Sequence, residues 1–165
     1  MATGDVTVRD LAPDDINACV HIALAAWAPV YASYRTILGE RLFHTVFPGW
    51  QQQKEAAIRS ACAGEHGAMA CVAERHGKVV GFVTFYCNHE TGMGEISNNA
   101  VHPDFQGEGI GTRMYHHVCD RFRALGMKFA RVSTGGDPSH APARRAYEKA
   151  GFAVALPGVD YFQEL

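Results

Sequence analysis

The stretch of sequence that decides the fold of this chain is Val101-His102-Pro103-Asp104-Phe105-Gln106-Gly107-Glu108-Gly109-Ile110-Gly111-Thr112. It ends a strand-like segment, turns through three glycines and opens an amphipathic helix expected over residues 109–125. The glycines lack the Cβ atoms that would hold a ligand away, and they permit positive φ angles. Successive N–H groups and the helix N-terminus can therefore converge on a phosphate. The alternative is a glycine-rich turn that holds no ligand.

The spacing of the glycines narrows the kind of phosphate loop. A Walker loop needs Gly-x-x-x-x-Gly-Lys-Ser/Thr and a dinucleotide fingerprint needs Gly-x-Gly-x-x-Gly, and neither pattern fits. Residues 106–111 instead resemble the Gln/Arg-x-x-Gly-x-Gly/Ala pyrophosphate loop of the GNAT family of N-acetyltransferases, which transfer acyl groups from coenzyme A. A second motif, Ala143 to Phe152 with Tyr147-Glu148-Lys149-Ala150-Gly151-Phe152, is similar to the tyrosine-bearing helix of that family. The resemblance covers residues 70–155, and the first 60 residues match only in pattern.

The order of the expected elements agrees with an α/β fold in one domain over residues 1–165. We expect strands at 6–9, 69–74, 79–88, 95–101 and 129–134, with further terminal strands after residue 152. Helices are expected from Pro13, over 39–47, 50–63 and 109–125, and near 143–152, with Pro29 as a break in the first. The resemblance implies a mixed, mostly antiparallel twisted sheet with helices on both faces. It also implies a parallel strand pair that splays to form a cleft, as in the acyl-CoA N-acyltransferase fold.

By resemblance, acetyl-CoA would lie in that cleft as the co-substrate. Backbone groups of Ala100 and Val101 would pair with its pantetheine arm as an added strand would. The pyrophosphate would be held by the backbone N–H groups of the loop, with the side chain of Glu108 turned to solvent. The loop positions are Gln106, Gly107, Glu108, Gly109, Ile110, Gly111 and Thr112.

The expected reaction needs an unprotonated amine and a proton for the departing thiolate. Because a free alkyl amine has a pKa near 10.4, a base or an ordered water is needed at neutral pH. Glu95 lies where the resemblance places the glutamate of the histone-modifying members of the family. The alternatives are a solvated glutamate at a strand edge, or a water held by Asn98 or Asn99.

Tyr147 is the expected proton donor, because its motif position matches the tyrosine that relatives place beside the coenzyme sulfur. A phenol stays protonated across the working pH range. The alternative is a tyrosine that only packs on the cofactor. His140 stands where relatives often carry an asparagine, and Asp137 is expected to cap the short helix that follows it.

The acceptor site is expected among Trp27, Tyr31 and Arg35, with Arg35 placed to hold a carboxylate. The two aromatic residues share a face only if the helix continues through Pro29. The alternative is that this stripe belongs to the core. The expected acceptor is a small-molecule or peptide amine.

Two functions from different classes fit these motifs. The first is an N-acetyltransferase that uses direct transfer in a ternary complex, and the absence of cysteine from the motifs favours it over a covalent intermediate. The second is a catalytically silent acyl-CoA sensor, which would need neither Glu95 nor Tyr147. Retention of Tyr147 favours the enzyme.

Composition limits the partners. A formal charge of −2 and 19% charged residues give no electrostatic case for nucleic acid or an anionic membrane surface. The five cysteines form no Cys-x-x-Cys pair, and His116 and His117 point about 100° apart on a helix, so no metal is expected. The N-terminal residues 1–5 carry no basic segment followed by an apolar run, and a cytoplasmic location is expected. A homodimer is suggested by the resemblance alone.

Overall fold

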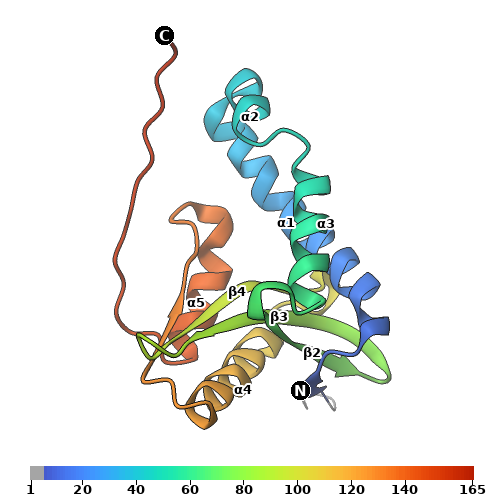
Figure 1. Cartoon of the computed structure of the whole chain (residues 1–165). Helices are drawn as coiled ribbons and strands as arrows, with labels where there is room; N and C mark the ends of the chain where they lie inside the picture. The colour runs from blue at the N-terminus through green and yellow to red at the C-terminus, as the bar shows by residue number, and fades with distance from the viewer. Residues whose placement is uncertain (1–5) are drawn as a thin grey trace.

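Five strands form one mixed sheet in the computed structural model, which describes residues 6–165 (Figure 1). The strands follow one another in chain order across the sheet, antiparallel from β1 to β4, and β5 lies parallel to β4. This arrangement confirms the expected mixed sheet with one parallel pair. The strands are β1 (Val6–Asp10), β2 (Met69–Arg75), β3 (Lys78–Asn88), β4 (Met93–Val101) and β5 (Phe129–Val132).

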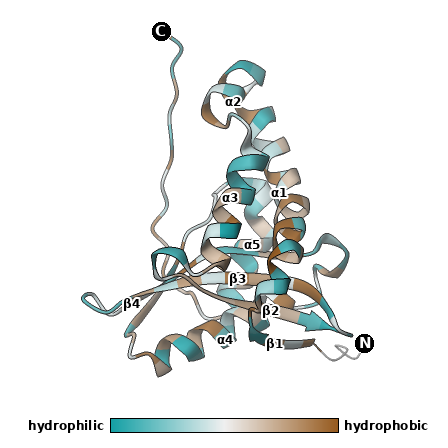
Figure 2. Ribbon diagram, turned by 45° about the vertical axis from the view of Figure 1, so that its right-hand side comes forward, coloured by the Kyte–Doolittle hydropathy of each residue, from teal (hydrophilic) through white to brown (hydrophobic). Residues whose placement is uncertain are grey.

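Helices cover both faces of the sheet. On one face α1 and α3 enclose a core with Val72 and Phe82, and on the other α4 and α5 enclose a core with Val83 and Phe85. Figure 2 shows the hydrophobic residues gathered along the sheet and on the part of α1 that lies over it. The helices are α1 (Ile16–Leu38), α2 (Glu40–Val46), α3 (Trp50–Cys62), α4 (Ile110–Ala124) and α5 (Ala141–Lys149), with short 3-10 turns η1 (Pro13–Asp15), η2 (Glu65–Gly67), η3 (Pro103–Phe105) and η4 (Pro138–His140).

Helix α1 continues through Pro29, so the break expected there does not occur. Proline cannot donate the N–H that would bond the carbonyl of Ala25. Both residues are exposed at the edge of a cleft, where water can satisfy that carbonyl. By length and composition alone, the segment Pro13–Leu38 would suffice to cross a membrane. In this fold its residues Cys19 and Ile22 are buried against the sheet.

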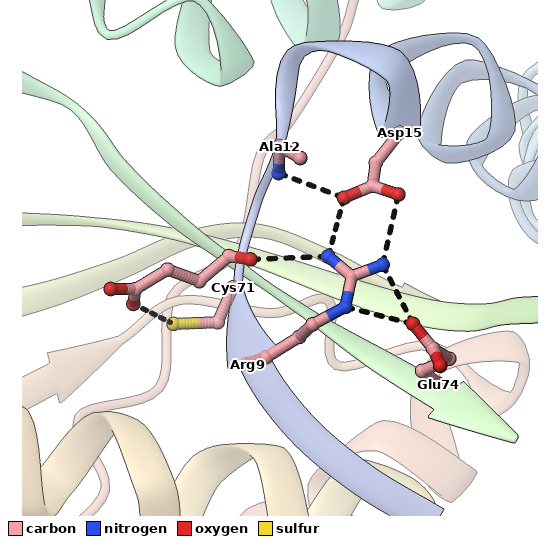
Figure 3. Close-up of polar contacts among 6 residues, drawn as sticks. Arg9, Ala12, Asp15, Cys71 and Glu74 are labelled. Carbon is pink, nitrogen blue, oxygen red and sulfur yellow. Dashed lines mark hydrogen bonds and ion pairs between the residues drawn. The ribbon is translucent and has the colours of Figure 1, made fainter. Parts of the chain in front are cut away.

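A charged cluster fixes the start of α1 to the edge of the sheet (Figure 3). The guanidinium of Arg9 on β1 bonds both carboxylate oxygens of Asp15, at 2.6 and 3.1 Å, and also Glu74 on β2 at 2.8 Å. Asp15 in turn accepts the backbone N–H of Ala12 at 2.8 Å. The hydrogen bonds from Arg9 lower the pKa of Asp15 and raise that of Arg9 itself. These contacts fix the start of α1 relative to β1 and β2.

The terminal strands expected after residue 152 are absent from the described chain. Residues 153–165 form an extended tail that leaves α5 and runs away from the sheet (Figure 1). The pair Pro157-Gly158 interrupts this segment, and its apolar side chains, such as Val154 and Leu156 at 98% exposure each, find no partner layer. β5 therefore keeps one unpaired edge.

Candidate active site

A cleft opens where β4 and β5 part. Their pairing runs from Met93–Phe129 to Ile96–Val132, whereas β4 continues to Val101. The pairing of β3 with β4 shifts register beside this point, and the hydroxyl of Thr84 on β3 fills the irregularity. It accepts the N–H of Asn98 at 3.0 Å and donates to its carbonyl at 3.2 Å. The cleft that results has a volume of about 550 Å³.

The glycine loop forms one wall of this cleft. Gly107 and Gly109 have φ angles of 82° and 79°, which glycine adopts without steric cost, and Gly109 caps the N-terminus of α4. The side chain of Gln106 donates to the carbonyl of Val101 at 3.0 Å and closes the loop onto the end of β4. Of the expected cofactor residues, all but Glu108 line the cleft: Ala100, Val101, Gln106, Gly107, Gly109, Ile110, Gly111 and Thr112.

Glu108 points away from the cleft. Its carboxylate pairs with Arg75 of β2 at 2.7 Å and is partly exposed. This contact braces the outer side of the loop while the inner side presents only backbone and small side chains. An anion in the cleft would meet N–H groups and the positive end of α4, with no carboxylate facing it from the loop.

Tyr147 lies on α5 and reaches the cleft from the opposite wall. Its side chain is 6% exposed, and its hydroxyl donates to Oδ1 of Asn99 at 3.2 Å. Tyr115 of α4 donates to the same oxygen at 2.7 Å, and the two rings lie 4.8 Å apart. Burial raises the pKa of Tyr147, although its hydrogen bonds to Asn99 and Tyr115 oppose the shift. The phenol is therefore a protonated donor beside the cleft at neutral pH.

An aspartate–histidine pair that sequence reasoning missed lies at the N-terminal end of α5, the helix that carries Tyr147. Nδ1 of His140 is 2.5 Å from Oδ1 of Asp137, and His140 lines the cleft. Burial would raise the pKa of Asp137, but the hydrogen bonds from Ser139 and His140 outweigh it and lower the pKa to about 2. The carboxylate is thus ionised, and it fixes the imidazole so that the other ring nitrogen, Nε2, is the free one. The signal in the sequence was the Asp-x-x-His spacing before α5.

The segment that carries this pair is held from several sides. Asp137 caps η4, the turn that leads into α5, by accepting the N–H of Ser139 at 3.0 Å, whereas the N-cap of α5 itself is His140, which makes no side-chain capping bond. Arg144 donates to the carbonyls of Gly135 and Asp137, at 2.6 and 2.9 Å. Tyr34 of α1 stacks on the imidazole with ring centroids 5.8 Å apart. The imidazole therefore has a defined orientation.

Glu95 is not among the cleft residues. It lies on the part of β4 that still pairs with β5, opposite Arg131, and its carboxylate is 3.8 Å from that guanidinium. Its role as a base stays a prediction.

The expected acceptor residues fall into two places. Trp27 lines the cleft, and Nζ of Lys54 lies 4.2 Å from the centre of its ring. Tyr31 and Arg35 line a separate pocket of about 180 Å³ between α1, α2 and α3. Tyr31 stacks on Trp50 at 4.1 Å within an aromatic cluster, so the interpretation of the stripe as core applies to this residue. We expected one acceptor site, but α2 and α3 pack against α1 and place these residues in two separate pockets. The expectation did not consider this packing.

The geometry agrees with what the comparisons with known proteins show. The family model described as "Acetyltransferase (GNAT) family" matches residues 31–152, which is most of the chain. The chain belongs to the GNAT family. Among solved structures, this GNAT fold is similar to the paiA N-acetyltransferase of Thermoplasma acidophilum in complex with coenzyme A, with a TM-score of 0.72, 16% identity, and coverage of 92% of this chain and 91% of that one. A ribosomal-protein-alanine N-acetyltransferase from Brucella melitensis gives a TM-score of 0.58 at 22% identity, covering 98% and 99% of the two chains.

Two curated relatives match by sequence over shorter stretches. The IAA acetyltransferase of Azospirillum brasilense is 35% identical over 86 residues, which are 52% of this chain and 55% of that protein. An amino-acid acetyltransferase of Ralstonia nicotianae is 40% identical over 57 residues, which are 34% of this chain and 13% of that protein. The chain thus spans about half or less of the length of these two curated relatives, both of which are named as acetyltransferases.

Proposed function

We propose that this GNAT protein is an N-acetyltransferase that moves the acetyl group of acetyl-CoA to a primary amine of a small molecule or peptide. The observation that carries the proposal is that one cleft is lined both by the glycine loop at the N-terminus of α4 and by two side chains capable of proton transfer, Tyr147 and His140. A sensor would need the loop alone. The names of relatives that specify an amino acid or the alanine of a ribosomal protein support an amine of this class.

The cofactor is proposed to lie along the open part of β4. Beyond Ile96 this strand has no β5 neighbour, so backbone groups near Ala100 and Val101 are available to the pantetheine arm. The pyrophosphate would then meet the N–H groups from Gln106 to Thr112 at the N-terminus of α4. This places the thioester toward Tyr147.

Transfer is proposed to be direct. No cysteine lines the cleft in the part of the chain that the structure describes, which supports attack by the amine on the thioester without an acyl-enzyme. The amine nitrogen bonds the carbonyl carbon, the carbon–sulfur bond breaks, and the thiolate takes the phenolic proton of Tyr147. Near the acceptor end, Trp27 offers an apolar wall and Ala25 a carbonyl free of its usual helical donor.

His140 is proposed as the base that removes the proton of the attacking amine. Asp137 holds Nδ1, as in other carboxylate–histidine pairs, so Nε2 can accept a proton. Glu95 is the competing candidate, and it would need an ordered water to act from outside the cleft.

The first experiment measures thiol release from acetyl-CoA across amines, amino acids, polyamines, aminoglycosides and peptides, with calorimetric binding of acetyl-CoA alongside. We expect turnover with at least one acceptor class. Binding without any turnover would favour the sensor, and no binding would remove the proposal.

A second experiment separates the two candidate bases. His140→Gln should lower kcat by about 100-fold, because the group that accepts the proton of the attacking amine is lost. Acetyl-CoA affinity should not change. Glu95→Gln should stay within a few fold of the parent, and His89→Gln, in the exposed β3–β4 turn, serves as control. The reverse pattern would transfer the role of base to Glu95.

A homodimer and a cytoplasmic location complete the proposal. The unpaired edge of β5 and the exposed apolar side chains of the tail support association between copies, since both are surfaces that proteins usually cover.

A further inference from the structure

We infer that Asp10, Cys71 and His117 form a zinc-binding site on the face of the sheet covered by α4. One potential ligand atom from each residue lies within 4.8 Å of the other two. The site is separate from the cleft and independent of the proposed acetyl transfer.

The three ligands come from three elements that pack together. Asp10, at the end of β1, lies directly opposite Cys71 of β2 in the strand register. The thiol of Cys71 is fully buried, and its sulfur, visible in Figure 3, is 3.7 Å from Oδ1 of Asp10. His117 is contributed by α4, which contacts both strands. Sequence spacing gave no sign of the site because no two ligands share an element.

An unsatisfied histidine nitrogen is the second observation. Nε2 of His117 is buried and has no hydrogen-bond partner within residues 6–165. Such a group is costly unless something bonds it, and buried ring nitrogens are common metal ligands. The long contact between Cys71 and Asp10 does not involve Nε2 of His117, whereas a metal ion would bond all three residues.

The distances and donor types fit Zn²⁺. Bond lengths of 2.0–2.3 Å place the ligand atoms of a tetrahedral zinc about 3.3–3.8 Å apart. The distance from the sulfur to Oδ1 of Asp10, 3.7 Å, already lies in this range, and the remaining separations, each at most 4.8 Å, need to close by about 1.5 Å at most. Thiolate with imidazole favours zinc over magnesium or calcium. A water would take the fourth position.

The charge balance also suits a divalent ion. Zinc would displace the proton of the Cys71 thiol to solvent, and the resulting thiolate and the carboxylate of Asp10 would together neutralise the metal. Arg121 bonds Oδ1 of Asp10 at 2.7 Å. A carboxylate oxygen has two lone pairs, so the metal would take this same oxygen, which lies 3.7 Å from the Cys71 sulfur, while Arg121 orients the carboxylate.

Bound zinc would tie β1 and β2 to the helix whose N-terminus carries the phosphate loop. The site therefore has a structural role, and loading should raise the thermal stability of the protein.

The test uses the purified full chain stripped of metal. Zn²⁺ affinity is measured by competition with a chromophoric chelator, and Co²⁺ is added as a probe for the thiolate-to-cobalt charge-transfer absorption. We expect one metal per chain, the cobalt–thiolate band, and a higher Tm with Zn²⁺. Cys71→Ser should abolish the band, and His117→Gln and Asp10→Asn should each weaken Zn²⁺ binding at least about 100-fold.

Matched controls lie on the same helix. His116→Gln changes an exposed neighbour, and Cys119→Ser changes a partly buried thiol, and both should keep parental Zn²⁺ affinity and the band. Asp10 is largely exposed, so Asp10→Asn tests the site even if Cys71→Ser fails to fold. Parental Zn²⁺ affinity in Asp10→Asn and His117→Gln, or a band that follows Cys119, would overturn the inference.

Discussion

The phenol of Tyr147 is the proposed proton donor to the leaving thiolate. Tyr147→Phe should lower kcat by about 100-fold or more, because positioned proton transfer is lost. Acetyl-CoA affinity should be unchanged, since the ring remains. The free energy of unfolding should fall by no more than about 1 kcal/mol, because Tyr115 still donates to Asn99. Steady-state kinetics, calorimetry and urea unfolding measure the three quantities.

Tyr115→Phe is the matched comparison for that variant. It also removes one buried donor to Asn99, but we expect less than a tenfold loss of kcat. Equal losses in both variants would mean that the two phenols act only by holding Asn99.

The ionised carboxylate of Asp137 links folding stability to pH. Its pKa is about 2 in the folded chain against 3.8 for the ordinary group, so the stabilisation is present above about pH 4 and is lost as the pH falls toward 2. Asp137→Asn should therefore lower the free energy of unfolding by on the order of 1–2 kcal/mol at pH 7, and the difference should shrink near pH 2. Urea unfolding across this range measures it. Asp104→Asn, which removes an exposed carboxylate, is the matched control.

At the scale of elements, the glycine turn and the N-terminus of α4 are proposed to act as one anion site. Gly109→Trp fills the mouth of the loop and also strains a residue with a φ of 79°. Gly126→Trp imposes the same strain at the other end of α4, where an added Cβ also meets open space. We expect calorimetry to show at least about a 100-fold loss of acetyl-CoA affinity in the first variant and none in the second, because only the first blocks the anion site. Equal losses would trace the effect to helix strain.

Local signals in the sequence determine the elements better than they determine how distant elements meet. The helix expected over 50–63 is observed as Trp50–Cys62, because apolar spacing and the break at Pro48-Gly49 act within one segment. The separation of Tyr31 from Trp27 depends instead on how α2 and α3 pack. In the sequence, Asp137 looked only like a helix cap. A capping carboxylate has a second oxygen, and only the folded loop shows that this oxygen bonds His140.

At the scale of the whole molecule, the tail is the part least tied to the protomer. Its apolar side chains are mostly exposed, Phe162 being the most covered of them at 51% exposure, and Glu164 at its far end pairs with Arg41 on the surface of α2. A monomer should therefore lose little free energy of unfolding when residues 154–165 are deleted, because no packed surface is removed. The same deletion would leave the β5 edge unpaired.

Deleting residues 154–165 separates the two roles that the tail can have. In the proposed homodimer the tail supplies apolar area and edge pairing to a second copy, so light scattering should find the full chain dimeric and the shortened chain monomeric. The Tm of the shortened chain should match that of the full chain diluted to its monomeric state. The shortened chain could instead melt several degrees lower than the diluted full chain. That result would show that the tail completes the sheet of its own protomer and closes the β5 edge within one molecule.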